Sequence, residues 1–399
     1  MNRNLTQLYS IAQKNEKRII GLMSGTSLDG LDIALCKIKG SGKNTTLVLS
    51  HFVTVPYSDD FRTEIKSVFS KEEVNLQKLC LLNEWVAKQH ARIINDCLQQ
   101  WKITAADIDI IASHGQTVYH APLSLHGLQK YGNGTLQIGD GDHLAVNTGI
   151  ITLSDFRQKH IAAGGEGAPL AAYGDYLLFR EEGTDVILLN IGGIANFTFL
   201  AANASAGNTF SSDTGPGNTM MDAWMQQNFS GIFYDKDAAI AKQGTINEPL
   251  LKKLSAHNFF KKPLPKTTGP ELFNLNYLDE AAKAAGINNI SVADTMATLN
   301  RFSGQTIVDA ILPMIKNNPC KIYVSGGGMH NPLLMDYLEL QLKAAAIYST
   351  DEKNINPDAK EAILFAILAN ECISGNAEEF PAGISNFPAI SMGKISFPH

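Results

Sequence analysis

Hydroxyl side chains, glycines and two aspartates stand together near the start of the chain, in the segment GLMSGTSLDGLDIALCKI. Glycine lets the backbone approach a bulky anion, and the hydroxyls of Ser24, Thr26 and Ser27 add donors beside backbone amides. A loop of this composition could bind a chain of phosphates. Because Mg²⁺ favours carboxylates together with phosphate oxygens, Asp29 or Asp32 could bind it directly or through water.

Two further glycine motifs occur in the second half of the chain. LNIGGIAN holds Gly192 and Gly193 between two apolar strands, and SGGGMHNPLL holds Gly326, Gly327 and Gly328 between a strand and a helix. A second glycine hairpin would supply more amides for a polyphosphate, and the triple glycine would let a flat nucleoside lie against bare backbone. Each cluster also fits a plain structural turn. The chain has neither a Walker P-loop nor a G-x-G-x-x-G fingerprint after a strand.

A carboxylate suited to proton transfer stands in SSDTGPGNTMMDAW. Asp213 is expected on a loop before a Gly-Pro-Gly turn, and a helix is expected to begin near Thr219. A carboxylate in this position would be exposed yet rigid, as a general base must be. An Asx turn or a helix cap is the alternative. Met220, Met221 and Trp224 are expected in the core.

Another anion site is possible at the turn GGEGAPL of residues 164–170. With Pro169 in the first turn of the following helix, backbone amides would be left free at the helix N-terminus. Just before it, the guanidinium of Arg157 could grip a carboxylate through two hydrogen bonds. A solvated ion pair between Arg157 and Asp155 is the alternative.

His114 and Gln116 in SHGQT end a buried strand. Ligand sites of α/β proteins gather at strand ends, so both are candidates for substrate binding. A structural role for a single strand-end histidine is the alternative.

Strands alternate with helices along the chain, which indicates an α/β protein. Residues 18–23 and 31–36 are expected to form the two strands of a hairpin around the first glycine loop. Apolar positions recur at helical spacing from Leu82 to Trp101, which predicts a helix there. The hairpins around GLMSGTSLDGLDIAL and LLNIGGIANFTFL resemble each other, so a duplicated domain is a hypothesis.

The composition of the 399 residues is that of a globular protein, with a net charge of −6 and five cysteines. The sequence has no basic stretch for nucleic acid and no apolar segment for a membrane, so neither partner is expected. The cysteines lack any C-x-x-C pair and are expected to be buried, reduced thiols of a cytoplasmic protein. The first residues are expected to form a short amphipathic helix before the first strand.

A set of motifs gives the chain a specific resemblance. It resembles the anhydro-N-acetylmuramic acid kinases of the sugar kinase, Hsp70 and actin superfamily, because the following stretches occur in the family's order: GLMSGTSLDGLD, SHGQT, QIGDGDHLA, DFRQKHIAAGGEGAPL, LNIGGIAN, DTGPGN, PKTTGPELFN, SGGGMHNPLL and EAILFAILA. Two departures are the N-terminal extension of residues 1–17 and Ala171 to Tyr173, where the family often has Val-Pro. Neither touches a residue proposed for chemistry.

The resemblance implies two actin-like (ribonuclease H-like) domains, each with a five-stranded mixed sheet, and an active-site cleft between them. We expect residues 1–155, joined by a C-terminal segment of about 376–399, to form the first domain, and 156–375 the second. It further implies an ATP-dependent phosphotransferase. Such an enzyme opens 1,6-anhydro-N-acetylmuramic acid with water and phosphorylates O6, which yields N-acetylmuramic acid 6-phosphate in peptidoglycan recycling. A homodimer is also expected.

The family's site residues map onto this chain by motif. Asp213 is the implied general base, which takes a proton from the water that attacks C1. ATP would contact Ser24, Gly25, Thr26, Ser27, Leu28, Asp29, Gly30, Asp32, Gly192, Gly193, Gly326, Gly327 and Gly328. The sugar would contact His114, Gln116, Arg157, Gly215 and Asn218. Mg²⁺ would be held by Asp29 and Glu361, although a solvated helix carboxylate is the alternative for Glu361.

Two other functions fit parts of this pattern. An actin-fold sugar kinase or phosphohydrolase acting on an open sugar would not need Asp213 to activate water. A sugar sensor coupled to DNA would need a basic helix-turn-helix, and the N-terminal extension is too short for one.

Overall fold

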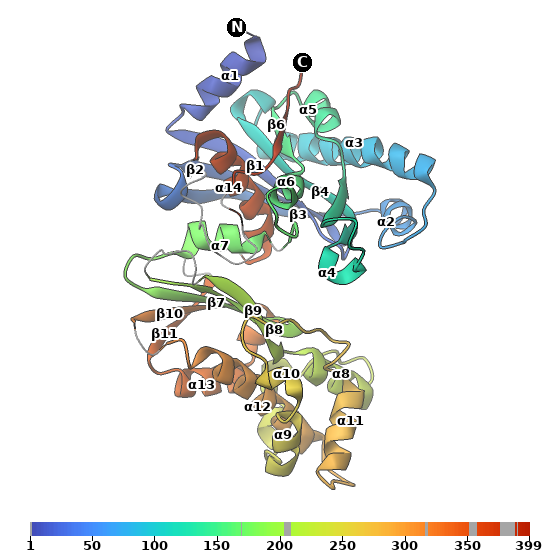
Figure 1. Cartoon of the computed structure of the whole chain (residues 1–399), viewed down its shortest axis with the longest axis vertical. Helices are drawn as coiled ribbons and strands as arrows, with labels where there is room; N and C mark the ends of the chain where they lie inside the picture. The colour runs from blue at the N-terminus through green and yellow to red at the C-terminus, as the bar shows by residue number, and fades with distance from the viewer. Residues whose placement is uncertain are drawn as a thin grey trace. The chain divides into compact units, whose positions relative to one another are not determined.

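The fold contains two similar β-hairpins, one in each half of the chain (Figure 1). The first joins β1 (Glu16–Ser24) to β2 (Gly30–Lys39) through a polar loop, and the second joins β7 (Asp185–Ile191) to β8 (Ile194–Leu200) through a glycine turn.

The computed structural model describes residues 2–168, 170–202, 209–315, 318–350, 357–375, 388 and 390–399. By its internal contacts the chain divides into two compact units. The first is Met1–Phe179 with Asp358–His399, and the second is Arg180–Ala204 with Asn208–Pro357. The expected limits at residues 155 and 376 both fall inside the first unit, in which the helix α7 (Ala171–Phe179) packs on the helix α14 (Lys360–Ser374).

The first unit is built on a mixed sheet of seven strands in the order β12-β6-β4-β1-β2-β3, with β5 paired to β4. The strands are β1 (Glu16–Ser24), β2 (Gly30–Lys39), β3 (Thr46–Pro56), β4 (Ile110–Ala121), β5 (Gly134–Ile138), β6 (Thr152–Ser154) and β12 (Lys394–Ser396). β1, β2 and β3 form an antiparallel meander, and β4 and β6 continue the sheet in parallel. The prediction of a five-stranded sheet is therefore wrong for this unit, because β5 pairs with β4 and β12 pairs with β6 as additional antiparallel strands.

The second unit has the predicted five strands, in the order β11-β10-β7-β8-β9. They are β7 (Asp185–Ile191), β8 (Ile194–Leu200), β9 (Phe210–Pro216), β10 (Cys320–Ser325) and β11 (Ala345–Ser349). Again the first three form an antiparallel meander, and β10 and β11 follow in parallel. The two similar hairpins, β1–β2 and β7–β8, thus take the same place in two sheets of like order, which supports the duplication.

Helices cover the sheet of the first unit. They are α1 (Arg3–Ala12), α2 (Asp59–Lys66), α3 (Leu76–Trp101), α4 (Leu123–His126), α5 (Gly141–Thr148), α6 (Phe156–Ala162), α7 (Ala171–Phe179) and α14 (Lys360–Ser374). α14 lies directly against β1 (Figure 1). A Cβ on Gly21 would come within 1.9 Å of the carbonyl oxygen of Ala362, so only glycine permits this approach. The predicted helix ending at Trp101 is confirmed, and it begins earlier, after the cap Asn75.

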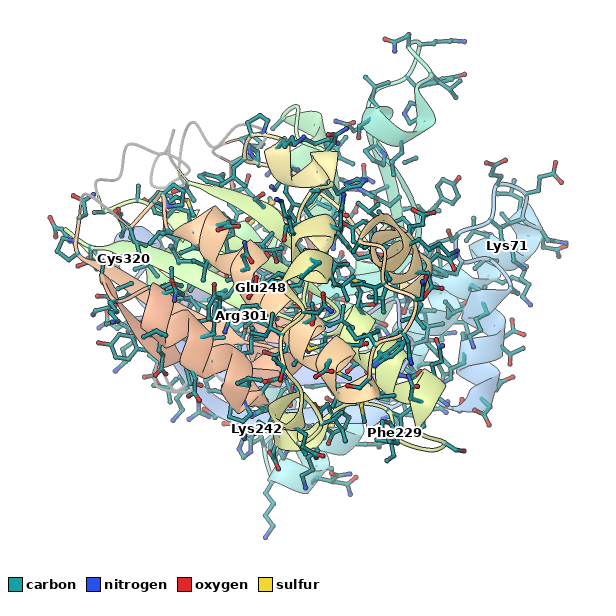
Figure 2. All side chains as sticks on the ribbon, turned by 90° about the horizontal axis from the view of Figure 1, so that it is seen from below. Lys71, Phe229, Lys242, Glu248, Arg301 and Cys320 are labelled. Carbon is teal, nitrogen blue, oxygen red and sulfur yellow. The ribbon has the colours of Figure 1, made fainter. Side chains whose placement is uncertain are left out.

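In the second unit the helices are α8 (Thr219–Asn228), α9 (Glu248–Leu254), α10 (Asn258–Lys261), α11 (Leu275–Ala284), α12 (Val292–Ile311) and α13 (Pro332–Gln341). α12 and α13 pack on the sheet through Ile307, Ile311 and Leu334. A second cluster joins α8 to α9, α11 and α12, and contains Met220 and Met221 as predicted. Arg301 on α12 and Glu248 on α9 are labelled in Figure 2.

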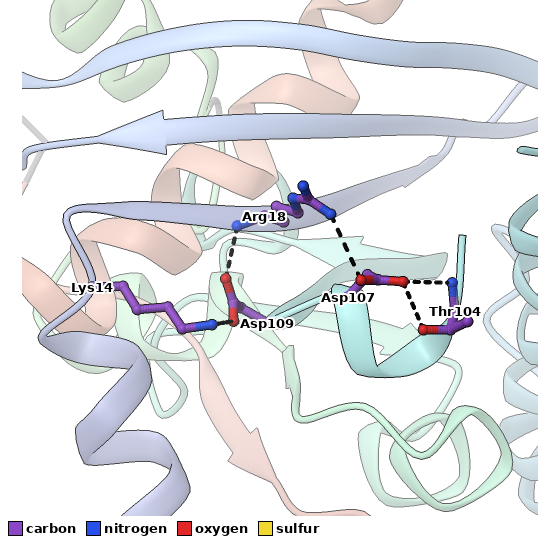
Figure 3. A network of polar contacts seen from close by, with 5 residues as sticks. All are labelled: Lys14, Arg18, Thr104, Asp107 and Asp109. Atoms are coloured by element: carbon purple, nitrogen blue, oxygen red, sulfur yellow. Dashed lines mark hydrogen bonds and ion pairs between the residues drawn. The ribbon is translucent and has the colours of Figure 1, made fainter. Parts of the chain in front are cut away.

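The N-terminal helix exists as predicted and is tied to the first sheet by a polar network (Figure 3). Lys14 lies between α1 and β1, and its Nζ is 2.5 Å from Oδ1 of the buried Asp109. The other oxygen of Asp109 accepts a hydrogen bond of 2.9 Å from the backbone N–H of Arg18. Asp107 joins the guanidinium of Arg18 to Thr104. The residues before β1 are thus part of the first unit.

The cysteines are free thiols. Cys36, Cys97 and Cys320 are buried as expected, whereas Cys80 is exposed on the outer face of α3 and Cys372 is half-buried. Expected burial was therefore wrong for Cys80, because its position on α3 faces solvent. Within the described part of the chain, no helix has the length and apolar character needed to cross a membrane.

Candidate functional site

The loop between β1 and β2 in the first unit is anchored by its one apolar side chain. Leu28 is buried, and its backbone takes a left-handed conformation with φ of 57°. Arg62 donates from Nε to the Leu28 carbonyl at 3.0 Å. Among the described residues no acceptor is found for the amides of Gly25, Thr26 and Ser27. A rigid loop with free amides is the arrangement that binds phosphate.

Asp29 at the end of this loop is held as a carboxylate. Its Oδ1 accepts from the Ser27 hydroxyl at 2.7 Å and from the Gly30 amide at 3.1 Å. The Ser27 hydrogen bond is the main cause of a lowered Asp29 pKa. A Cβ on Gly30 would come within 2.6 Å of the Val55 carbonyl oxygen, so this glycine serves strand packing.

Asp32 and Glu361 in the first unit are two carboxylates, and the charge of Asp32 disfavours ionisation of Glu361. Asp32 is half-buried on β2 and accepts from the Thr54 hydroxyl. Burial is the main cause of its raised pKa. The Glu361 side chain in the first turn of α14 reaches solvent, yet partial loss of water raises its pKa, and the charge of Asp32 adds to the effect. Of the predicted phosphate and metal ligands, Asp32 therefore has the largest electrostatic effect on the Glu361 pKa.

This arrangement fits a metal bound chiefly by a ligand's phosphates. In the described ranges no group of three or more His, Cys, Asp or Glu side chains is placed to hold a metal ion. Mg²⁺ typically uses one or two protein carboxylates, phosphate oxygens and water. Asp32 and Glu361, with Asp29 on the adjacent loop, are consistent with that mode.

Arg157 and His114 contact each other in the first unit. The guanidinium donates from Nε to Nε2 of His114 at 2.9 Å and from Nη1 to the Gly167 carbonyl at 2.7 Å. Burial first, and then the Arg157 charge, lowers the His114 pKa to about 3, so the imidazole stays neutral. The alternative pairing of Arg157 with Asp155 is wrong, because Asp155 pairs with Lys394.

Three of the amides in the turn of residues 164–170, where an anion site was expected, are used within the protein. The amides of Gly164 and Gly165 donate to carbonyls of α6, and the Gly167 amide donates to Nδ1 of His160 at 2.9 Å. Pro169 lies outside the described residues. The turn therefore consumes these donors in its own fold.

His114 also lines a polar cavity of about 380 Å³ in the first unit. Part of the QIGDGDHLA motif forms another wall of this cavity, and Asp140 caps α5 there by accepting from the Asp142 amide at 2.9 Å. Gln116, in contrast, is fully buried and makes its hydrogen bonds within the protein, to Ser24, Gly25 and Thr117. Its contacts point to a role in shaping the β1–β2 loop.

Asp213 in the second unit lies within β9, so the predicted loop position was wrong. Its Oδ2 accepts from the Thr268 amide at 2.7 Å, and its own amide donates to the Lys266 carbonyl at 2.9 Å. The segment Lys266–Thr268 thus pairs with β9 like an added strand edge. Half-burial is the main cause of a raised Asp213 pKa, which Glu271 raises further. A fixed carboxylate with raised basicity is suited to accept a proton.

The DTGPGN turn after Asp213 is held by the glycine hairpin between β7 and β8. The amides of Gly217 and Asn218 donate to the carbonyls of Gly193 and Gly192, each at 2.8 Å. A Cβ on Gly217 would lie 2.3 Å from the Gly192 carbonyl oxygen. In the described part of the chain no acceptor is found for the amides of Gly192 and Gly193, which leaves them for a ligand.

Sequence reasoning missed two polar residues of α12 that support this turn. Ser303 donates to the Gly217 carbonyl at 2.8 Å. Thr306 lies where a Cβ on Gly215, at φ of 152°, would approach its Oγ1 to 3.1 Å. Gly215 thus has a packing role. Small polar residues three apart on a buried helix were the available signal.

The three glycines after β10 have different roles. A Cβ on Gly326 would approach the Ile191 carbonyl oxygen to 2.7 Å, and one on Gly328 would approach Cγ2 of Ile191 to 2.2 Å. At Gly327 the nearest atom would be Nδ2 of Asn218, at 3.6 Å. Gly326 and Gly328 therefore serve packing, and only Gly327 presents backbone to open space.

Gly327 and Asn218 line one cavity of about 610 Å³ in the second unit. Exposed Phe233 and Tyr234 border it, together with Asp222. Burial raises the Asp222 pKa to about 6. The cavity thus offers bare backbone, aromatic faces and a carboxylate, a combination suited to a nucleoside. Asn218 thus lies in the same cavity as Gly327 of the triple glycine. In the sequence, the aromatic pair Phe233 and Tyr234 in the segment IFYD was the signal for this cavity that sequence reasoning missed.

Comparisons with known proteins identify the family. A family model described as anhydro-N-acetylmuramic acid kinase matches residues 17–398. Proteins of that name from Pseudoalteromonas atlantica and Caldanaerobacter subterraneus subsp. tengcongensis are 56% and 37% identical to the chain. The alignments cover 100% and 98% of this chain and 100% of each relative.

A solved ROK family glucokinase from Streptomyces griseus, in complex with glucose and AMPPNP, has a TM-score of 0.32 at 12% identity. The match covers 88% of this chain and 98% of that one, and supports no argument at this level. The sequence matches confirm the resemblance, and with it a phosphotransferase acting on an alcohol group: the chain belongs to the anhydro-N-acetylmuramic acid kinase family.

Proposed function

We propose that the protein opens the 1,6-anhydro bond of anhydro-N-acetylmuramic acid with water and transfers the γ-phosphoryl group of ATP to O6. The products are N-acetylmuramic acid 6-phosphate and ADP. The observation that carries the proposal is the state of Asp213, a half-buried carboxylate fixed by the Thr268 amide, with its pKa raised by burial. Water is a poor nucleophile and gains most from such a base.

Asp213 takes one proton from water while the water oxygen bonds to C1 of the sugar. The bond between C1 and O6 breaks, and O6 accepts the γ-phosphoryl group as the bond to the ADP oxygen breaks. Asp213 later releases its proton to solvent. Phosphoryl transfer itself needs mainly alignment and charge neutralisation, so one base suffices.

ATP would bind through backbone amides that have no acceptor in the described part of the chain. Its phosphates would meet the amides of Gly25 to Ser27 and of Gly192 and Gly193. Its nucleoside would lie on Gly327 in the cavity with Asn218. Mg²⁺ would be held by Glu361 with Asp29 or Asp32, and would neutralise phosphate charge when bound.

The sugar would contact Arg157 and Gly215. Arg157 would contact its carboxylate or hydroxyls with the donor capacity that His114 and Gly167 leave, and His114 keeps the guanidinium in place. Gly215 would contact the sugar only through its backbone. A role in peptidoglycan recycling follows from the products. The cytoplasmic location and the homodimer stay predictions.

Mass spectrometry of the products formed in ¹⁸O-labelled water tests the reaction. The assay contains ATP, Mg²⁺ and the anhydro sugar, with the open sugar in a parallel assay. A phosphorylated product with one ¹⁸O at C1 before anomeric exchange is expected. If the anhydro sugar stays unchanged while the open sugar is phosphorylated, the protein is an ordinary sugar kinase.

A further inference from the structure

A chain of buried hydrogen bonds runs beneath the β1–β2 loop. It joins Ser24 at the end of β1 to Tyr57 after β3, to His90 in the middle of α3 and to Gln116 on β4. The Ser24 Oγ lies 2.6 Å from the Tyr57 hydroxyl, which lies 2.9 Å from Nε2 of His90. None of the four side chains is more than 4% exposed. Unpaired polar atoms at this depth would be costly, so the chain is held in one arrangement.

The direction of each hydrogen bond follows from the ends of the chain. Nε2 of Gln116 donates to the carbonyls of Gly25 and Thr117, which fixes the side-chain amide with Oε1 toward Ser24. That oxygen can only accept a hydrogen bond, so the Ser24 hydroxyl donates its proton to it.

Ser24 Oγ must then accept from Tyr57, and the Tyr57 oxygen must accept from N–H at Nε2 of His90. His90 is neutral, because burial lowers its pKa to about 4. Every donor in the chain therefore points toward the loop.

The chain acts on both ends of the loop. At the first end, Gln116 holds the carbonyl of Gly25 at 3.4 Å. At the other end, the Tyr57 amide donates to the Asp29 carbonyl at 3.1 Å. The ring of Tyr57 stacks on Phe61 at 3.9 Å between centroids and is itself fixed. The buried hydrogen-bond chain therefore holds the loop at both ends, at Gly25 and at Asp29.

We propose that Tyr57 and His90 are positioning residues for ATP, which hold the loop from Gly25 to Asp29 in the shape that receives the phosphates. The inference rests on the proposed function of that loop. Both side chains are buried, so their effect on ATP would pass through Ser24, Gln116 and the loop backbone.

Tyr57→Phe tests this directly, because it removes one hydroxyl and keeps the ring on Phe61. Tyr323→Phe is the matched control: Tyr323 is equally buried, in the second unit, and its hydroxyl donates to Glu181 at 3.0 Å. Calorimetry of ATP binding without sugar, and separate KM values for ATP and sugar, are the measurements. We expect ATP affinity to fall roughly fivefold or more in Tyr57→Phe, with the sugar KM unchanged, since the His90 N–H loses its acceptor and the Ser24 oxygen loses its donor. Unchanged ATP affinity, or an equal loss in Tyr323→Phe, overturns the inference.

A second pair covers the case in which Tyr57→Phe does not fold. His90→Gln keeps an N–H donor at a similar reach, whereas His90→Leu removes it. Tight ATP binding in the Gln variant and weak binding in the Leu variant are expected; equal ATP affinity in the two is the contrary result. Because ATP binding is measured without sugar, a wild-type protein that binds ATP but leaves the anhydro sugar intact would refute the proposed reaction and still allow this test.

Discussion

Replacing Asp213 with asparagine should separate catalysis from stability. The amide oxygen of Asn can still accept from the Thr268 amide, so the local geometry is kept. Burial disfavours the ionised carboxylate, as its raised pKa indicates, so the neutral side chain should leave the free energy of unfolding at pH 7 unchanged or slightly higher. The variant, however, cannot take a proton from water.

The expected loss in kcat is about 10²- to 10⁴-fold, the usual contribution of a general base, which equals about 3 to 5 kcal/mol. The wild-type kcat should fall as pH drops through the Asp213 pKa, because only the carboxylate accepts a proton. The residual activity of Asp213→Asn should lack this acid limb. Steady-state kinetics from pH 4 to 9 at saturating ATP, with ATP binding by calorimetry, provide the measurements.

Asp294→Asn is the matched control in the same unit. Asp294 also accepts from a backbone amide, that of Thr245 at 2.6 Å, but its hydrogen bonds lower its pKa. This variant should lose stability and keep its kcat, the reverse of Asp213→Asn. If Asp213→Asn turns over normally, or loses activity only together with ATP binding and folding, Asp213 is not the base.

Four further substitutions probe the rest of the site. Gly328→Ala should lower the free energy of unfolding by about 1 to 3 kcal/mol, because its Cβ would overlap Ile191, whereas Gly327→Ala should keep stability and weaken ATP binding roughly tenfold. Urea titration and calorimetry would show this, and equal destabilisation would contradict it. Asp222 has its pKa raised from 3.8 to about 6 in the fold, so the native state binds the proton more tightly. The free energy of unfolding should therefore fall as pH rises from about 4 to about 6, and Asp222→Asn should flatten this part of the profile; an unaltered slope would exclude Asp222 as the cause. Glu361→Gln should raise the Mg²⁺ concentration for half-maximal activity roughly tenfold without altering the sugar KM, whereas an unchanged Mg²⁺ titration would remove Glu361 from the metal site.

Much of the fold could be predicted because its signals are local. The hairpin around Gly25, the helix that ends at Trp101 and the N-terminal helix each follow from the spacing of apolar residues. The similarity of the β1–β2 and β7–β8 hairpins foretold two sheets of like strand order. The strands β5 and β12 were not foreseen, since each is short and becomes a strand only by pairing with a distant neighbour.

The candidate site was predictable in its residue types and less so in their roles. Asp213 and the glycine motifs could be named from sequence, but the bonds of Gln116 and the partner of Arg157 could not. Tyr57 and His90 gave no signal, because a single tyrosine and a single helical histidine are usual in cores.

The sequence by itself determined the order of the motifs, the family, and the local turns that expose amides, because these depend on neighbouring residues. Only the tertiary structure decided which donors are already used and which glycines face open space. The carbonyl that Arg157 contacts and the Ile191 side chain that excludes a Cβ at Gly328 are set by packing between separate elements. Hydrogen bonding and steric exclusion act over a few ångströms in space, and the sequence does not record which distant residues come that close.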